Sequence, residues 1–590
     1  MKPCLAKLLI FLSLLTYAGC QHSDRERSPV PFAEKLSFDP SLELKFRPNI
    51  VWLVSEDLSP MIPAFGDSTI STPNLDRLAK EGVRYTNVAS PSGVCAPSRH
   101  ALATGMYPTS TGGHNMRVQY VKSHMDKLGL ILYEVVLPPE VRMMSQVLRE
   151  SGYYCTNNDK QDYQFRPPAT AWDDSSLKAH WRNRKPGQPF FSVFNFDITH
   201  ESHVWSPISK VETRYDDPKF PAIDLTKYSG GEKINPLDWK LNVPEYQEVP
   251  VPPYLPATDT VKKDIRRVYS NIIEMDRQVG KILGQLEKDG LLDSTIVFWY
   301  SDNGGPLPRQ KRLLYESGIH IPCLIRFPGM AGAGAYDDQL ISFVDFAPTV
   351  FSLAGIKAPG YIQGQAFLGR YKSDAERMHI FAAADRLDTE IDMIRAVRNK
   401  RYKYLKNYYP SKPYYLPVVF REQMPTMREL LRMNESNSLD EYQSQWFRES
   451  KPDEELYDII ADPHELHNIA IDPANSAILL ELRMACETWM NEIGELGQIP
   501  EKELIELFWP GRRQPKTENL SYQIIDQEVK LLCKTEGANI GYQVLPLDAE
   551  PGGAWEIYSK SIKIKPYTGL LAVAHRIGFS PSDTLKIEFR

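Results

Sequence analysis

Residues Ser92–Thr111 read S-G-V-C-A-P-S-R-H-A-L-A-T-G-M-Y-P-T-S-T, and this stretch decides how the rest of the chain is interpreted. Pro97 favours a helix that begins here, because proline fits the first helical turn, where its missing N–H is no loss. Cys95 then lies at the start of that helix, where free backbone N–H groups and the helix dipole favour an anion. Arg99 follows one turn later with a planar cation suited to a tetrahedral oxyanion. A buried structural cysteine is the alternative, and these residues alone do not exclude it.

The overall composition limits the classes of function. The chain has 590 residues, which is long enough for a large core and more than one domain. Its formal net charge is −6, which argues against a general nucleic-acid-binding protein. An anionic substrate would therefore need cations gathered locally in the fold.

The N-terminus has the pattern of an export signal. Two lysines precede the apolar run 8–17, which is too short to cross a bilayer. The run leads to Y-A-G-C ending at Cys20, which resembles a bacterial lipobox, so Cys20 is a candidate for lipidation. We expect a signal peptide at 1–19, a polar tether at 20–47, and an exported bacterial protein in the periplasm or on the outer membrane. The lipid at Cys20 would be its link to the membrane, and the other cysteines lack disulfide-framework spacing.

Two predicted buried strands end in oxygen-bearing side chains. The apolar runs 49–54 and 296–300 each lead directly to a pair of oxygen donors: Glu56 and Asp57 after the first, Asp302 and Asn303 after the second. Open α/β sheets bind ligands at the carboxyl ends of their strands, and carboxylate and amide oxygens suit calcium or magnesium. For either pair taken alone, a solvated polar turn is the alternative.

Loop residues add further candidates for substrate contact. His114 and Arg117 follow the Cys95 stretch, and His203 follows the buried-strand run 190–196. Polar side chains in loops are most often simply solvated. We therefore predict these three as substrate-binding residues only in combination with the rest of a site.

The Cys95 stretch resembles the signature of the type I sulfatases of the alkaline phosphatase superfamily. In that family a sulfatase-maturing enzyme oxidises the cysteine to formylglycine (3-oxoalanine), and the hydrated aldehyde is the nucleophile. The resemblance implies the same conversion of Cys95. It also implies one bound calcium ion, with these ligands: Glu56, Asp57, Cys95, Asp302 and Asn303. Glu56 departs from the family pattern, which usually has an aspartate there.

The resemblance further implies which residues surround the sulfate. Lys160 and His200 match family positions after two more strands, and Lys311 matches a sulfate-binding cation beyond Asp302. The predicted catalytic residues are therefore Cys95, Arg99, Lys160, His200 and Lys311, with Lys311 also binding substrate. Asp162 stands where the family has a histidine, and an ionised aspartate cannot donate a hydrogen bond.

We predict an α/β fold class with three parts. A large, mixed, mostly parallel sheet flanked by helices, as in alkaline phosphatase, is expected over 48–385. A smaller C-terminal α+β subdomain is expected over 386–515, and an all-β, sandwich-like module over 516–590. The strongest helical pattern is 261–288, with one continuous apolar stripe. The preceding Pro-rich segment 206–260 is predicted to wall the substrate pocket.

The sequence thus predicts a sulfatase acting on sulfate ester or sulfamate groups of a sulfated polysaccharide or oligosaccharide. Residues around D-N-G-G-P-L-P and near Tyr414 resemble the heparan N-sulfatase (sulfamidase) branch, and an ulvan-type algal polysaccharide is the alternative substrate. Two other functions stay open at this stage. One is a related phosphatase or phosphonate hydrolase, and the other is a sulfated-glycan-binding protein whose Cys95 stays unmodified.

Overall fold

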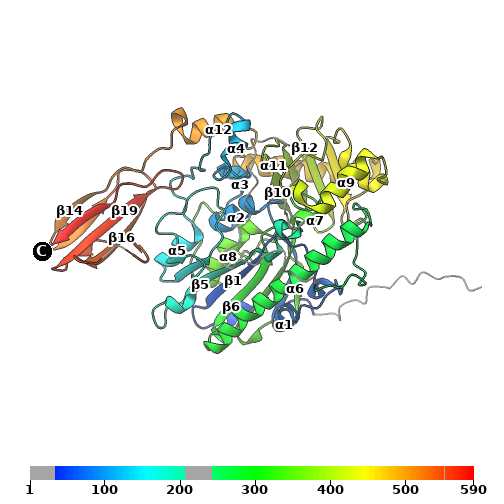
Figure 1. The fold of residues 1–590 in the computed structure, drawn as a ribbon. Helices are drawn as coiled ribbons and strands as arrows, with labels where there is room; N and C mark the ends of the chain where they lie inside the picture. Colours follow the sequence, from blue (N-terminus) through cyan, green and yellow to red (C-terminus); the bar gives the residue numbers. More distant parts are fainter. Residues whose placement is uncertain (1–33, 206–241, 550–551) are drawn as a thin grey trace, which may run out of the picture.

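The computed structural model describes residues 34–205, 242–549 and 552–590. Figure 1 shows a large sheet with helices on both faces, a second smaller sheet, and a β-rich C-terminal module at one end of the molecule. The predicted α/β class is therefore confirmed. The expected signal peptide, Cys20 and most of the Pro-rich segment lie outside the described residues. Within the described ranges, no helix combines the length and apolarity that a membrane span requires.

The central sheet has the strand order β4-β3-β5-β1-β6-β7-β2-β8, with β9 also pairing with β2. The strands from β4 to β6 run parallel, whereas β7 runs antiparallel to both of its neighbours. The strands are β1 (Asn49–Ser55), β2 (Val83–Ala89), β3 (Tyr154–Asn158), β4 (Asp174–Ser175), β5 (Phe190–Phe196), β6 (Thr295–Ser301), β7 (His320–Arg326), β8 (Tyr336–Asp337) and β9 (Ile341–Ser342).

Strand β1 lies in the middle of this sheet and contributes to two hydrophobic cores. Val51 and Leu53 face one core, and Trp52 and Val54 face the other, because successive side chains of a strand alternate between faces. All seven residues of β1 are buried, which explains its continuous apolar sequence. The first core includes residues of α1 (Pro73–Glu81) and α6 (Asp259–Lys288); the second includes residues of α2 (Cys95–Thr104), α5 (Met144–Glu150) and α8 (Phe346–Leu353).

Helix α6 is the long helix that the sequence predicts. It begins two residues earlier than expected because the Thr258 side chain caps it by accepting a hydrogen bond from the Val261 N–H. Its buried apolar stripe packs against α1 and the first core. Helix α6 therefore covers one face of the central sheet.

The second sheet is antiparallel, with the order β10-β11-β12-β13. Strand β10 ends at Ala384, so this sheet begins before the domain boundary expected at 385. Its strands are β10 (Ile380–Ala384), β11 (Ile394–Arg398), β12 (Tyr402–Asn407) and β13 (Glu454–Asp458). The remaining helices are α3 (Pro108–Thr111), α4 (Lys122–Lys127), α7 (Glu316–Ile319), α9 (Pro425–Glu435), α10 (Glu441–Ser444), α11 (Ser476–Ile493) and α12 (Glu501–Phe508).

The C-terminal module consists of a three-stranded and a four-stranded sheet around a small core of their own. It contacts the central domain at Gly578, whose φ is 88° and where a Cβ would lie 2.5 Å from the Val135 carbonyl oxygen. Its strands are β14 (Ser521–Ile525), β15 (Glu528–Leu532), β16 (Asn539–Pro546), β17 (Glu556–Ile557), β18 (Ile562–Lys563), β19 (Thr568–His575) and β20 (Leu585–Phe589). Its sandwich-like architecture agrees with the sequence prediction.

Candidate active site

The two predicted oxygen-donor pairs meet at one edge of the central sheet. Strands β1 and β6 are parallel neighbours in register, with Ser55 opposite Ser301, so the residues that follow each strand lie side by side. The Asp57 N–H donates to Asp302 Oδ1 at 3.2 Å, and Asn303 Nδ2 donates to Asp57 Oδ1 at 2.9 Å. Parallel pairing therefore brings together residues that are 245 positions apart.

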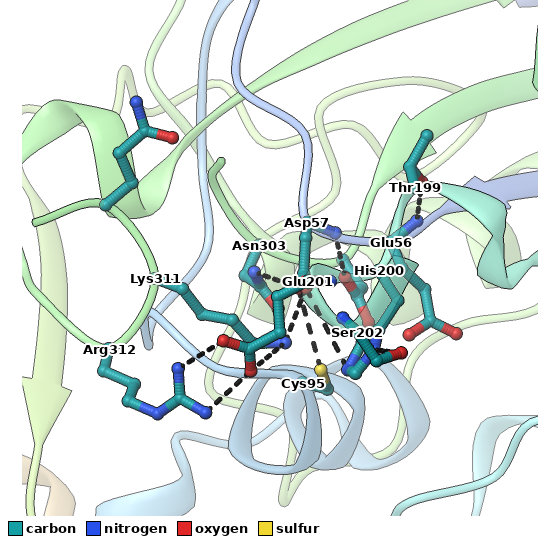
Figure 2. Close-up of polar contacts among 12 residues, drawn as sticks. Glu56, Asp57, Cys95, Thr199, His200, Glu201, Ser202, Asn303, Lys311 and Arg312 are labelled. Atoms are coloured by element: carbon teal, nitrogen blue, oxygen red, sulfur yellow. Dashed lines mark hydrogen bonds and ion pairs between the residues drawn. The ribbon is translucent and has the colours of Figure 1, made fainter. Parts of the chain in front are cut away.

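Cys95 lies beside these donors as the first residue of α2 (Figure 2). Its Sγ is 4.0 Å from Asp57 Oδ1, and the residue is only 2% exposed. Burial raises the pKa of the Cys95 thiol to about 12, and the opposing effect of Lys160 and Lys311 is smaller. The position at the helix start thus does not produce a thiolate, contrary to what the helix dipole alone favours. The thiol is therefore neutral at ordinary pH and poorly suited to act as a nucleophile.

Each predicted carboxylate ligand is paired with a predicted cation. Lys311 Nζ lies 2.6 Å from Asp57 Oδ2, and Lys160 Nζ lies 2.6 Å from Glu56 Oε2. The third pair joins Arg99 Nε to Asp302 Oδ2 at 2.9 Å. Buried charges need such partners, because transfer from water is costly for an isolated ion.

Burial also sets the ionisation of these groups. Burial raises the pKa of Glu56 to about 7, although Lys160 opposes the change. For Lys311, burial alone would lower the pKa, but the nearby negative charges, Asp57 first and then Glu201, hold it above its ordinary value. Lys311 is therefore a protonated ammonium beside the Cys95 position.

The donor set fits a hard divalent cation. One ligand atom each from Asp57, Cys95 and Asp302 lies within 4.8 Å of the other two. Asn303 Oδ1 is buried and accepts no hydrogen bond from any residue that the structure describes. An unsatisfied buried carbonyl oxygen is costly, and a metal ion would satisfy it. Glu56 forms a second such group with Cys95 and His200.

His200 lies at the carboxyl end of β5, between two short 3-10 turns. Its Nε2 is 4.0 Å from Asp57 Oδ2, while its Nδ1 accepts a hydrogen bond from the Ser202 N–H at 3.3 Å. In the neutral ring this bond leaves the proton on Nε2, which is the nitrogen closer to Asp57. Burial, and then Lys311, lower the pKa of His200 well below its usual value.

The sequence interpretation missed Glu201 and Arg312. The Glu201 N–H donates to Asp57 Oδ2 at 2.8 Å, and its carboxylate accepts two hydrogen bonds from Arg312, at 2.7 and 2.8 Å. Lys311 Nζ lies 3.2 Å from the same carboxylate (Figure 2). Burial raises the pKa of Glu201, but Arg312 and Lys311 outweigh burial and hold it at about 2. The signal was available, since Glu201 follows His200 and Arg312 follows Lys311 directly.

The three loop residues predicted to bind substrate, Arg117, His203 and His114, do not all contact this cluster. Arg117 pairs with Asp388 at 3.0 Å and stacks on Phe420, whose ring centroid is 6.1 Å from that of His200. His203 lies close enough to His200 to lower the pKa of that residue. His114 is buried among other charged groups, Arg395, Glu495 and Glu501, and is not brought to the Cys95 cluster.

Asp162 lies beside Lys160 rather than facing away from it. Its Oδ2 is 3.7 Å from Lys160 Nζ, and both side chains are about a quarter exposed, at 24% and 23%. Lys160 thus joins the buried Glu56 to a carboxylate nearer the solvent.

The fold is that of the sulfatases. A family model described as sulfatase matches residues 48–356, and one described as N-sulphoglucosamine sulphohydrolase, C-terminal, matches residues 309–441. The chain belongs to the sulfatase family, and it is a sulfuric ester hydrolase acting on sulfated glycans.

Several sulfatases are similar to this chain over most of its length. An ulvan-active sulfatase of Formosa agariphila is 49% identical over 98% of this chain and 97% of its own length. Human N-sulphoglucosamine sulphohydrolase is 23% identical over 75% of this chain and 90% of its own. A solved structure of a protein in complex with its substrate D-glucosamine-2-N,6-O-disulfate shares the fold, with a TM-score of 0.54 and 18% identity. It covers 77% of this chain and all of its own.

Proposed function

We propose that this sulfatase is exported, carries formylglycine at position 95, binds one calcium ion, and removes sulfate from an ulvan-type polysaccharide. The observation that supports the chemistry is the surroundings of Cys95: a neutral, buried thiol beside three carboxylates and three cations. The observation that supports the substrate is 49% identity, over nearly the whole chain, to a protein named as an ulvan-active sulfatase.

The calcium ion would be held by Asp57, Asp302 and the free Oδ1 of Asn303, with Glu56 beside them. When bound, such an ion polarises oxygen atoms and lowers the pKa of a coordinated hydroxyl. The formylglycine would supply that hydroxyl from its hydrated aldehyde.

The chain's own residues would handle the charge of the sulfate and the proton. Arg99, Lys160 and Lys311 bring three cations to the carboxylates beside Cys95 and would offset charge on the sulfate oxygens. Removing one such donor typically lowers the rate by a factor of about 10² to 10³. The protonated Lys311 would donate a proton to the leaving oxygen, and His200, with its proton on Nε2, would donate a hydrogen bond to it.

Mass spectrometry of the peptide that contains Cys95 tests the modification directly. We expect the mass of formylglycine when the chain is produced together with a sulfatase-maturing enzyme, and the mass of cysteine without that enzyme. Cys95→Ala should abolish sulfate release. Full activity in that variant, or tight glycan binding without turnover in the mature protein, would contradict the mechanism. Faster turnover of phosphate or phosphonate esters than of sulfate esters would assign the chain to the related hydrolases.

A second substrate, N-sulfated heparan, is favoured by one observation, the match of residues 309–441 to the N-sulphoglucosamine sulphohydrolase C-terminal model. Sulfate release from ulvan oligosaccharides and from heparin oligosaccharides should be compared under the same conditions. Release from ulvan alone supports the primary proposal, and release from heparin alone supports the second. Membrane fractionation of the full chain against Cys20→Ser tests export and lipidation.

A further inference from the structure

A pocket of 220 Å³ lies where the central domain meets the second sheet. It is separate from the residues proposed for catalysis, and none of those residues lines it. Six of the lining residues are aromatic or cationic: Arg309, Tyr315, Tyr414, Trp446, Arg448 and Tyr457. Rings of this kind stack on sugars, and arginine forks bind carboxylate and sulfate groups.

The tyrosine rings are held in place by Glu455, which is fully buried. Tyr315 and Tyr457 donate their hydroxyl protons to Glu455 Oε2 at 3.2 and 2.6 Å. Asn407 Nδ2 donates to the other carboxylate oxygen at 2.6 Å. These three donors occupy the Glu455 carboxylate, so the rings form a preorganised wall and the carboxylate is not left to pair with a cation.

The arginines give the pocket an excess of positive charge. Arg309 donates to the His464 and Glu465 carbonyl oxygens at 2.9 and 2.7 Å and stacks over Tyr315 at 4.2 Å. Arg448 is exposed at the pocket's edge. Among the residues that the structure describes, neither arginine has a carboxylate oxygen within 4.0 Å.

A third arginine borders the pocket. Arg421 is 3% exposed, and its guanidinium lies 4.7 Å from the centroid of the Trp446 ring, which lines the pocket. It donates to the Leu416 carbonyl oxygen, and its Nε has no partner within the described part of the chain. Trp446 Nε1 is likewise buried without a partner there. Unpaired buried donors of this kind favour a ligand that brings acceptor oxygens.

One loop contributes a residue to the pocket and another to the catalytic cluster. Lys311 binds Asp57 in the cluster, and Arg309, two residues earlier, lines the pocket. Two residues of extended chain span at most about 7 Å. The main chains that carry the two sites are therefore neighbours.

We propose that this pocket binds one acidic sugar unit of the substrate glycan, through its carboxylate or sulfate group, on Arg309 and Arg448 between the rings of Tyr414 and Trp446. The pocket has room for a single sugar ring. The assignment rests on the proposed function, since it makes the pocket a specificity site for the same substrate.

Calorimetric titration of the full-length Cys95→Ala variant tests the binding without turnover. The probes are D-glucuronate, glucose 6-sulfate and glucose. We expect both acidic sugars to bind at least tenfold more tightly than glucose, and Arg448→Gln to weaken the acidic sugars about tenfold with glucose unchanged. Arg513→Gln, another exposed arginine outside the pocket, is the matched control. Equal affinity for glucose and the acidic sugars, or unchanged affinity in Arg448→Gln, overturns the proposal. If both acidic sugars respond to Arg448→Gln, the pocket recognises any anionic group; if one does, it is selective for that group.

Kinetics distinguish this inference from the proposed function. For the mature enzyme, Arg448→Gln and Tyr414→Phe should raise KM about tenfold for ulvan oligosaccharides with intact uronate carboxylates, and less than twofold for carboxyl-reduced ones. The same KM change for both substrates overturns the inference while leaving a working sulfatase. Absence of sulfate release from any glycan overturns the proposed function, and the calorimetry then decides the pocket by itself.

Discussion

Replacing Glu201 with glutamine should reveal how much the active site depends on the buried carboxylate that pairs with Arg312 and Lys311. The variant keeps the main-chain N–H that donates to Asp57 at 2.8 Å. It removes the negative charge that Arg312 holds with two hydrogen bonds and that Lys311 approaches at 3.2 Å. Lys311 then keeps Asp57 at 2.6 Å, whereas Arg312 keeps only the weaker attraction of Asp388 and Asp57.

The magnitude follows from the burial of all three groups, whose side chains are at most 3% exposed. Breaking a buried ion pair costs about 3–5 kcal/mol. At about 2.1 cal/mol/K per residue, a cooperative unit of about 340 residues loses about 4 °C of melting temperature for 3 kcal/mol. Because Glu201 supports a proposed calcium ligand, we also expect a 10- to 100-fold loss of calcium affinity or of kcat/KM.

Differential scanning calorimetry and calcium titration of the full chain measure these effects. Glu429→Gln is the matched control, because Glu429 also accepts two hydrogen bonds from an arginine, Arg432, whose side chain is 64% exposed. An exposed pair of that kind contributes less than about 1 kcal/mol. A Glu201→Gln enzyme with unchanged melting temperature, calcium affinity and activity would refute the reasoning.

Other substitutions give equally specific expectations. Burial raises the pKa of Asp264 from 3.8 to about 6, so the folded state is favoured at low pH and this contribution is lost as the pH rises from 3.8 through 6. In the Asp264→Asn variant the side-chain oxygen can still accept the hydrogen bonds from the Thr426 N–H and hydroxyl, which are 2.8 and 2.7 Å long. The substitution should raise the free energy of unfolding by about 3 kcal/mol at pH 8 and leave it unchanged at pH 3. Urea unfolding at both pH values measures this difference. Asn303→Ala should weaken calcium binding at least tenfold while leaving the calcium-free melting temperature within about 2 °C, whereas equal calcium affinity would remove Asn303 from the ligand set. Arg149→Met removes the hydrogen bonds from Arg149 to the Trp555 and Thr170 carbonyl oxygens. The rate at which a protease cleaves the C-terminal module should then rise several-fold. Cleavage at the wild-type rate would contradict a role of Arg149 in docking this module.

Much of the fold could be predicted because the sequence signals are local. The continuous apolar runs predict β1 and β6 as buried strands, and the three- and four-residue spacing of apolar positions predicts α6. The start of α6 was misplaced by two residues, because the Thr258 cap does not stand out in an apolar pattern. The boundary expected at 385 misses the pairing of β10 with β11, since strand pairing is not encoded locally.

The residues of the candidate site likewise fall into two groups, those that the sequence predicts and those that it does not. Cys95, Arg99 and the carboxylates after β1 and β6 can be found from their spacing and from the position of their strands. Glu201 and Arg312 stand next to the predicted His200 and Lys311, but their pairing with each other across 111 positions of the chain cannot be found in this way. The ionisation state of Cys95 was also beyond the sequence, because burial raises its pKa and the helix start favours the opposite change.

The sequence by itself thus indicated the class of enzyme, two of the strands that carry the site, and the residue that is the proposed precursor of the nucleophile. The tertiary structure decided which carboxylate pairs with which cation, that the Cys95 thiol is neutral, and that His114 lies apart from the cluster. The physical reason is that a motif fixes residue types over a few positions, whereas charge pairing and burial depend on distances between strands and loops that only the folded chain brings together.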